Sequence, residues 1–226
     1  MTVAMRWHAV QARVAAACER AGRPISDVTV IAVSKTHPAE AIREAIAAGA
    51  IDFGENYAQE LATKVTELGA AGPIRWHFIG RLQRNKAKLV AGRVALVHAV
   101  DTVELAEELA RRAGGVVQPI LLAVNLAGED SKGGVTAESA PAIARALAAV
   151  AGCSLDGLMT MPPPSDDAAA GQPFFDGLRT LRDRLRDDLG RPLPVLSMGM
   201  SHDFEVAIAC GATHVRIGTA IFGHRG

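Results

Sequence analysis

The sequence predicts a (β/α)8 barrel, in which eight parallel strands form a closed ring inside a layer of helices, with one extra helix at the amino terminus. Three observations favour this fold. Short apolar runs alternate with amphipathic helical segments along the 226-residue chain, which is typical of a parallel sheet with both faces covered. Eight such units in about 200 residues lie at the short end of the range for barrels. An open doubly wound sheet usually carries a GxGxxG turn after its first strand, and none is found there.

The extra helix is predicted first, over Val3–Ala21. Apolar residues such as Val10 and Val14 recur near the helical spacing, and Gly22 with Pro24 supplies a stop signal.

Strand-like and helix-like segments then alternate to the end of the chain. The predicted strands are Val28–Ser34, Ala50–Gly54, Arg75–Gly80, Ala95–Val100, Pro119–Asn125, Leu155–Thr160, Val195–Gly199 and Thr213–Gly218. The predicted helices are Pro38–Ala48, Glu55–Leu68, Asn85–Ala91, Val103–Ala113, Ala137–Ala149, Phe174–Leu189 and Phe204–Cys210. No linker divides these units, so residues 1–226 are expected to form a single domain. The segment richest in breakers, 162–167, lies where the loop after the sixth strand belongs.

The composition excludes several classes of partner. Lys and Arg total 24 and Asp and Glu total 24, so no overall field attracts nucleic acid or anionic lipid. The cysteines are far apart and form no CxxC pair, which indicates reduced thiols in a cytosolic protein and no metal site. No apolar run approaches the roughly 20 residues that span a bilayer, and the amino terminus lacks the features of a secretory signal. We expect a cytoplasmic protein, and a monomer because no long exposed apolar stripe demands a partner.

Lys35 is the most informative residue, because it closes the apolar run of the first predicted strand. Burial disfavours the ammonium form of lysine. The uncharged amine is a nucleophile that forms a Schiff base with an aldehyde. The alternative, which position alone favours, is a lysine whose stem packs at the strand end while its amine reaches solvent.

The loops after the last two strands predict a phosphate site. Active sites of such barrels lie at the carboxyl ends of the strands, and a phosphate is often held by these two loops and a helix amino terminus. Ser201 is predicted as the N-cap of the helix that follows the seventh strand, and Gly218-Thr219 turns at the end of the eighth. Glycine lets the backbone approach the oxygens, and a hydroxyl adds a donor. The alternative is an ordinary cap and an ordinary turn.

Arg216 is the second unusual placement. Strand alternation puts it on the same face as His214 and Gly218, pointing inward. A buried guanidinium needs an acceptor, which a structural salt bridge would also supply. An amine, a phosphate cradle and an inward arginine together fit an aldehyde cofactor with a phosphate and a ring acceptor. Pyridoxal 5′-phosphate (PLP) has all three groups.

Longer motifs extend over nearly the whole chain. They are Ala32-Val33-Ser34-Lys35-Thr36, Phe53-Gly54-Glu55-Asn56-Tyr57, Trp76-His77-Phe78-Ile79-Gly80, Leu82-Gln83-Arg84-Asn85-Lys86, Ser131-Lys132-Gly133-Gly134, Gly157-Leu158-Met159, Leu196-Ser197-Met198-Gly199-Met200-Ser201 and the segment from Val215 to Gly223. In this order they resemble the pyridoxal phosphate homeostasis proteins. The resemblance implies the barrel domain of alanine racemase standing alone, with PLP on the lysine of the first strand. It also implies a role in PLP and vitamin B6 balance, with no robust catalytic turnover and with apo PLP-dependent enzymes as recipients.

The resemblance also implies roles for single residues. Lys35 resembles the Schiff-base lysine, and Arg216 the residue that faces the pyridine nitrogen. The other implied contacts are Ser201, Gly218 and Thr219 at the phosphate and Asn56, His77 and Met198 along the pocket wall. Arg81 and His202 carry no weight, because members of the family vary at these positions.

The chemistry favours a carrier over an enzyme. An arginine at the pyridine nitrogen leaves that nitrogen unprotonated, which weakens the electron sink. Racemisation needs an acid/base group on each face of the cofactor. In alanine racemase a tyrosine of a second domain supplies one of them, and we expect no room for such a domain here, where the only tyrosine is Tyr57. Two alternatives stay open, a PLP-dependent amino-acid racemase of the alanine racemase type and a lysine-dependent aldolase that holds a sugar phosphate. No residue is assigned a catalytic role.

Overall fold

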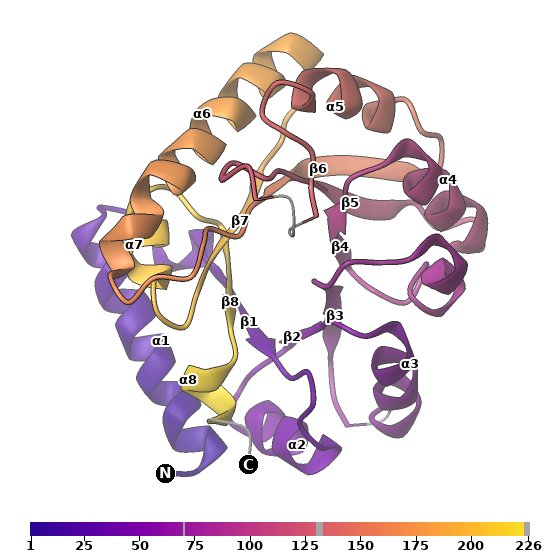
Figure 1. The fold of residues 1–226 in the computed structure, drawn as a ribbon. Coiled ribbons are helices and arrows are strands. Elements are labelled where there is room, and N and C mark those ends of the chain that lie inside the picture. The colour runs from indigo at the N-terminus through magenta and orange to yellow at the C-terminus, as the bar shows by residue number, and fades with distance from the viewer. Residues whose placement is uncertain (70, 130–132, 224–226) are drawn as a thin grey trace.

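The computed structural model describes residues 1–69, 71–129 and 133–223 and confirms the predicted barrel. Eight strands form a closed ring in chain order, and β8 returns to pair in parallel with β1 (Figure 1). The strands are β1 (Thr29–Val33), β2 (Asp52–Glu55), β3 (Arg75–Phe78), β4 (Leu96–Val100), β5 (Gln118–Ala123), β6 (Cys153–Met159), β7 (Val195–Met200) and β8 (His214–Ile217). Each begins and ends within two residues of the prediction. Ser131 and Lys132 of the quoted motif lie outside the described residues.

Helices surround the ring. They are α1 (Val3–Arg20), α2 (Ala39–Ala47), α3 (Ala58–Glu67), α4 (Val103–Arg112), α5 (Ala140–Ala148), α6 (Gln172–Leu189), α7 (Phe204–Ala209) and α8 (Thr219–Phe222), with 3-10 helices η1 (Ile25–Asp27), η2 (Arg84–Leu89) and η3 (Ala168–Gly171). In the part of the chain that the structure describes, no helix combines the length and the apolarity needed to cross a bilayer.

Two local predictions are wrong, and one short helix was not predicted. The segment Asn85–Ala91 is not an α-helix, because the chain there forms the 3-10 helix η2, a tighter winding that is typical of short pieces. Glu55 does not begin a helix, because its side chain is fully buried at the end of β2. The sequence also gave no sign of α8, which is four residues long and too short to show a helical period.

Strand alternation divides the interior into two layers. Most apolar side chains pack between the strands and the helices, where the rings of Phe53 and Trp76 lie 5.9 Å apart. On β8, Val215 and Ile217 belong to this outer layer. Arg216 lies between them in sequence, and its side chain therefore points into the ring. The strands and the outer apolar layer thus separate the polar groups inside the ring from the solvent around the helices.

Helix α1 covers the seam where β8 meets β1. It packs against α2, α7 and α8 (Figure 1) and buries Trp7, Val10 and Val14. The helices next to this seam are short, with six residues in α7 and four in α8. An extra helix therefore shields the part of the barrel that these short helices leave open.

Two glycine substitutions test the packing of the ring. A Cβ at Gly157 in β6 would lie 1.9 Å from the carbonyl oxygen of Val195 in β7, so we expect Gly157→Ala to separate the two strands and to cost about 3 kcal/mol or more. Gly177→Ala in α6 is the control, because its Cβ would meet only a Leu126 methyl group at 3.6 Å. There alanine should stabilise the helix by about 0.5–1 kcal/mol. Urea unfolding followed by circular dichroism measures both, and equal effects would contradict the prediction.

Candidate cofactor site

A cavity of about 500 Å³ opens at the carboxyl ends of the strands. Six of the residues predicted for the cofactor line it, namely Lys35, Asn56, Ser201, Arg216, Gly218 and Thr219. They come from the ends of β1, β2, β7 and β8 and from the loops that follow. Strands distant in sequence contribute together because parallel strands in a barrel end at the same rim.

Lys35 follows β1 directly and is half-buried. It lies in the turn after the strand, and the next residue, Thr36, has φ 64. A left-handed backbone at a β-branched residue costs about 1–3 kcal/mol unless its surroundings enforce it. A buried polar network beneath the turn supplies this support.

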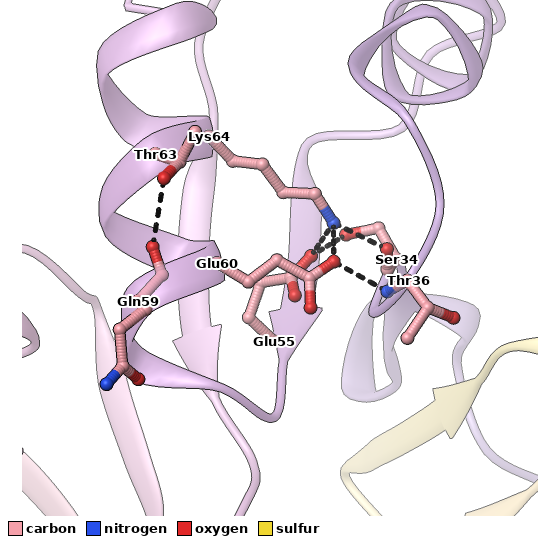
Figure 2. Close-up of polar contacts among 7 residues, drawn as sticks. All are labelled: Ser34, Thr36, Glu55, Gln59, Glu60, Thr63 and Lys64. Atoms are coloured by element: carbon pink, nitrogen blue, oxygen red, sulfur yellow. Dashed lines mark hydrogen bonds and ion pairs between the residues drawn. The ribbon is translucent and has the colours of Figure 1, made fainter.

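The centre of the network is Lys64 of α3 (Figure 2). Its ammonium donates three hydrogen bonds of 2.7 Å, to the carbonyl oxygen of Ser34, to Glu55 Oε1 and to Glu60 Oε1. Glu60 Oε1 also accepts a 2.6 Å bond from the backbone N–H of Thr36. The main chain is therefore fixed on both sides of Lys35, through Ser34 and through Thr36.

Glu55 lies at the most buried point of this network, at 0 % exposure. Its Oε1 also accepts a 2.6 Å hydrogen bond from the Ser34 hydroxyl. Burial raises the pKa of Glu55, and the bonds from Lys64 and Ser34 offset only part of that effect. Glu55 and Lys64 were not predicted to support the site, although the Glu60–Lys64 pair at i, i+4 was visible in the sequence.

Arg216 lies at the floor of the cavity and is 6 % exposed. Its Nη1 donates to Ser197 Oγ at 2.5 Å and its Nη2 to the carbonyl oxygen of Thr160 at 3.0 Å. Desolvation lowers the pKa of Arg216 to about 10, so the guanidinium stays charged at neutral pH. Among the described residues these bonds use two of its five N–H groups.

The loops after β7 and β8 are tied together by Ser201. Its hydroxyl oxygen accepts hydrogen bonds from the backbone N–H groups of Gly218 (3.2 Å) and Ala220 (3.3 Å). The prediction that Ser201 is the N-cap of α7 is wrong, because Asp203 holds that position. Ser201 bridges the two loops instead, and its own O–H remains as a donor.

The donor set of the cavity fits an anionic aldehyde. Cationic side chains of Lys35, Arg81 and Arg216 line it together with the carboxylate of Asp101, so positive charge exceeds negative charge. The Oδ1 atom of Asn56 is buried and has no hydrogen-bond partner among the described residues. An amine, cationic groups, hydroxyls and the Asn56 amide oxygen are therefore gathered around one cavity.

Gly80 shapes the wall beside Asn56. A Cβ at this position would lie 2.2 Å from the backbone oxygen of Asn56, so only glycine lets the loops after β2 and β3 approach so closely.

Two predicted pocket residues do not line this cavity. His77 lies within β3 rather than at its end, and its ring bonds Asp52 and His98 toward the other end of the barrel. Met198 is fully buried in the outer apolar layer. A register shift in β7 between Ser197 and Met200 brings Met200 to the cavity instead.

Several polar or sulfur-bearing residues of the wall were not predicted. Asp101 follows β4 directly, so the rule that selected Lys35 could have found it. Arg81 and His202, to which the resemblance gives no weight, line the cavity together with Met200.

Comparison with known proteins identifies the class first. The family of alanine racemase N-terminal domains matches residues 6–226. An alanine racemase of Corynebacterium glutamicum superposes with a TM-score of 0.73 at 17 % identity, over 97 % of this chain and 62 % of that chain. At that identity the likeness shows the fold alone. The chain is thus a barrel of the alanine racemase N-terminal class.

Proteins with higher sequence identity to this chain identify the family within this class. A pyridoxal phosphate homeostasis protein of Aquifex aeolicus is 44 % identical over 227 residues, covering 100 % of this chain and 99 % of the relative. One of Pseudomonas aeruginosa is 46 % identical over 226 residues, covering 99 % and 96 %. PipY of Synechococcus elongatus, solved with PLP bound, has a TM-score of 0.86 and 37 % identity, covering 98 % of this chain and 100 % of PipY. The chain belongs to the pyridoxal phosphate homeostasis protein family, which confirms the resemblance found in the motifs.

The network under Lys35 can be tested by substitution. We expect Lys64→Met to leave Glu55 and Glu60 without their cation and to lower the free energy of unfolding by about 3–5 kcal/mol. Thr63→Ala is a matched control on the same helix, because the exposed Thr63 hydroxyl bonds only to the Gln59 carbonyl in Figure 2, and its effect should stay within about 0.5 kcal/mol. Denaturant unfolding measures both values. A Lys64→Met protein as stable as the parent would contradict the proposed support.

The histidines inside the ring predict a pH dependence of stability. Burial lowers the pKa of His214 to about 4 from its ordinary 6.5, and the nearby His77 adds to that effect. Between pH 6.5 and 4, His214 is protonated in the unfolded chain but stays neutral in the folded chain. The free energy of unfolding therefore falls as the pH drops through this range. The fall due to His214 should reach up to about 3 kcal/mol and disappear in His214→Asn. His8→Asn, an exposed histidine on α1, is the control, and equal pH profiles for the two variants would refute the assignment.

Proposed function

We propose that this protein binds PLP as a Schiff base on Lys35 and acts in intracellular PLP homeostasis without robust catalytic turnover. One observation carries the proposal. The lysine at the end of β1, the buried Arg216 and the loops of Ser201 and Gly218 line a single cavity. The bound PLP in PipY, a relative of the same fold and length, supports the same ligand.

Each side chain then has a distinct task. The Lys35 amine supplies the covalent link, and the polar network of Lys64 holds its backbone. The hydroxyls of Ser201 and Thr219 suit the phosphate as O–H donors, and Gly218 lets the backbone come close to it, while the Gly218 N–H fixes the loop by its bond to Ser201. PLP supplies a reactive aldehyde and a ring that can delocalise electrons.

Arg216 supports a carrier rather than an enzyme. A guanidinium can only donate hydrogen bonds, so it suits an unprotonated pyridine nitrogen and therefore a weak electron sink. A racemase also needs a second acid/base group opposite the lysine. Tyr57, the only tyrosine in the chain, is 56 % exposed and does not belong to the lining of this cavity.

The proposal also covers the compartment, the oligomeric state and the partners of the protein. We infer a cytoplasmic monomer that folds as one domain and passes PLP to apo PLP-dependent enzymes. The balanced formal charge supports the absence of nucleic-acid and membrane partners. Large apolar side chains that are exposed in the described residues are scattered over several elements, which is ordinary for a monomer.

Absorbance spectroscopy with reductive trapping tests the function. We expect the purified protein to turn yellow with PLP, and borohydride followed by peptide mass mapping to place the reduced adduct on Lys35. Lys35→Ala should lose the band, while Lys88→Ala, which removes an exposed lysine of η2, should keep it.

Other outcomes would point elsewhere. A protein that stays colourless with PLP but is trapped on Lys35 by a sugar-phosphate aldehyde would favour the aldolase. Rapid loss of optical activity from a pure L-amino acid would favour the racemase. Trapping of PLP at another lysine would overturn the role of Lys35.

A further inference from the structure

A line of buried polar side chains runs through the ring beneath Arg216. Its members are Ser197 and His98, both 0 % exposed, His77 at 4 % and Asp52 at 5 %. They come from β7, β4, β3 and β2, respectively. None of them belongs to the lining of the cofactor cavity, so the function proposed above does not explain why the barrel buries them.

The four residues and Arg216 form one continuous chain of hydrogen bonds. Arg216 Nη1 is 2.5 Å from Ser197 Oγ, and Ser197 Oγ is 2.8 Å from His98 Nδ1. His98 Nε2 is 3.1 Å from His77 Nδ1, and His77 Nε2 is 2.9 Å from Asp52 Oδ1. The chain thus links the floor of the cofactor cavity to the opposite mouth of the barrel, where Asp52 and His77 line a second cavity of about 210 Å³.

The two ends fix the direction of every bond. A guanidinium can only donate, and an ionised carboxylate can only accept. Ser197 therefore accepts from Arg216 and gives its own proton to His98 Nδ1. His98 then donates from Nε2 to His77, and His77 donates from Nε2 to Asp52. Both rings are neutral Nε2–H tautomers in this arrangement, and every bond is satisfied without another buried charge.

The charges around the chain agree with this direction. Burial lowers the pKa of His98 well below the ordinary value, and the repulsion that a second positive charge would meet beside His77, His214 and Arg216 acts in the same direction. Burial opposes ionisation of Asp52, yet hydrogen bonds from His77 and Arg75 keep its pKa below the usual range. On the solvent side, Arg75 donates hydrogen bonds of 2.8 Å and 2.6 Å to the two carboxylate oxygens of Asp52. The rings of His77 and His98 also pack against His214.

We propose that Ser197, His98, His77 and Asp52 are positioning residues for Arg216. The Asp52 carboxylate sets the direction of the chain, and the chain presents Ser197 to Arg216 as a fixed acceptor. The guanidinium is thereby held at the cavity floor with its remaining N–H groups available to the ligand. The inference takes the ligand, PLP, from the proposed function, but the direction of the chain does not depend on that ligand.

The first test measures tautomers in the protein without PLP. Long-range ¹H–¹⁵N correlation spectra of the ¹⁵N-labelled protein at neutral pH should show both His77 and His98 protonated on Nε2 alone. A proton on Nδ1 of either ring would overturn the chain as drawn. This measurement needs no variant and remains decisive even if PLP does not bind.

The second test is a double-mutant cycle read by the dissociation constant for PLP. Neither Asp52 nor Ser197 lines the cofactor cavity, so binding should persist in both variants. Asp52→Asn replaces an obligate acceptor by an amide that can also donate, and it should weaken binding about threefold or more. Ser197→Ala interrupts the chain, so adding Asp52→Asn to it should have little further effect. Asp156→Asn is the control, because this carboxylate lines the same second cavity as Asp52 but does not belong to the chain of hydrogen bonds.

The outcomes separate the two proposals. Independent, multiplicative effects of Asp52→Asn and Ser197→Ala, or an equal loss in Asp156→Asn, would overturn the positioning role while PLP binding stands. A complete lack of PLP binding by the parent protein would refute the proposed function, and the tautomers would then decide the direction of the chain alone.

Discussion

The site depends on the pairing of β8 with β1. This pairing places Ile31 beside Arg216 and Ala32 beside Ile217, so the first strand of the ring ends next to the last. Lys35 and the Gly218 turn are neighbours only because the ring closes there. Helix α1 covers the same seam, since α7 and α8 are too short to do so. An element outside the βα repeat therefore protects the pairing on which the cofactor cavity depends.

The barrel holds its buried cations in different ways. The Lys64 ammonium makes three hydrogen bonds, two of them to carboxylates, and this suits a structural role beneath the Lys35 turn. Arg216 bonds a hydroxyl and a carbonyl, and the carboxylate of its hydrogen-bonded chain lies four bonds away at Asp52. A cation without an adjacent carboxylate can still serve a ligand, whereas one that is already neutralised cannot do so as readily.

Much of the architecture was predictable because parallel strands and their helices leave a strong periodic signal. All eight strands were found from apolar runs, and Lys35, Asn56 and Thr219 were placed at the cavity by the rule that barrel sites lie at strand ends. The strand-end rule does not place residues that lie within a strand. His77 was assigned to the pocket from the resemblance, but a residue in the middle of a strand lies deeper in the ring. Met198 was also assigned from the resemblance, but it follows the inward Ser197 and therefore points into the outer apolar layer. The irregularity of β7, which no sequence pattern marks, brings Met200 to the cavity.

The sequence by itself determined the fold class, the lysine at the first strand end and the kind of ligand, since these follow from local periodicity and from side-chain chemistry. Only the tertiary structure decided which groups support them. The clamp of Glu55, Glu60 and Lys64 joins β2, α3 and the turn after β1, and the chain from Arg216 to Asp52 crosses five strands. Such networks depend on distances between residues far apart in sequence, and hydrogen bonds of this geometry arise only after the ring has closed.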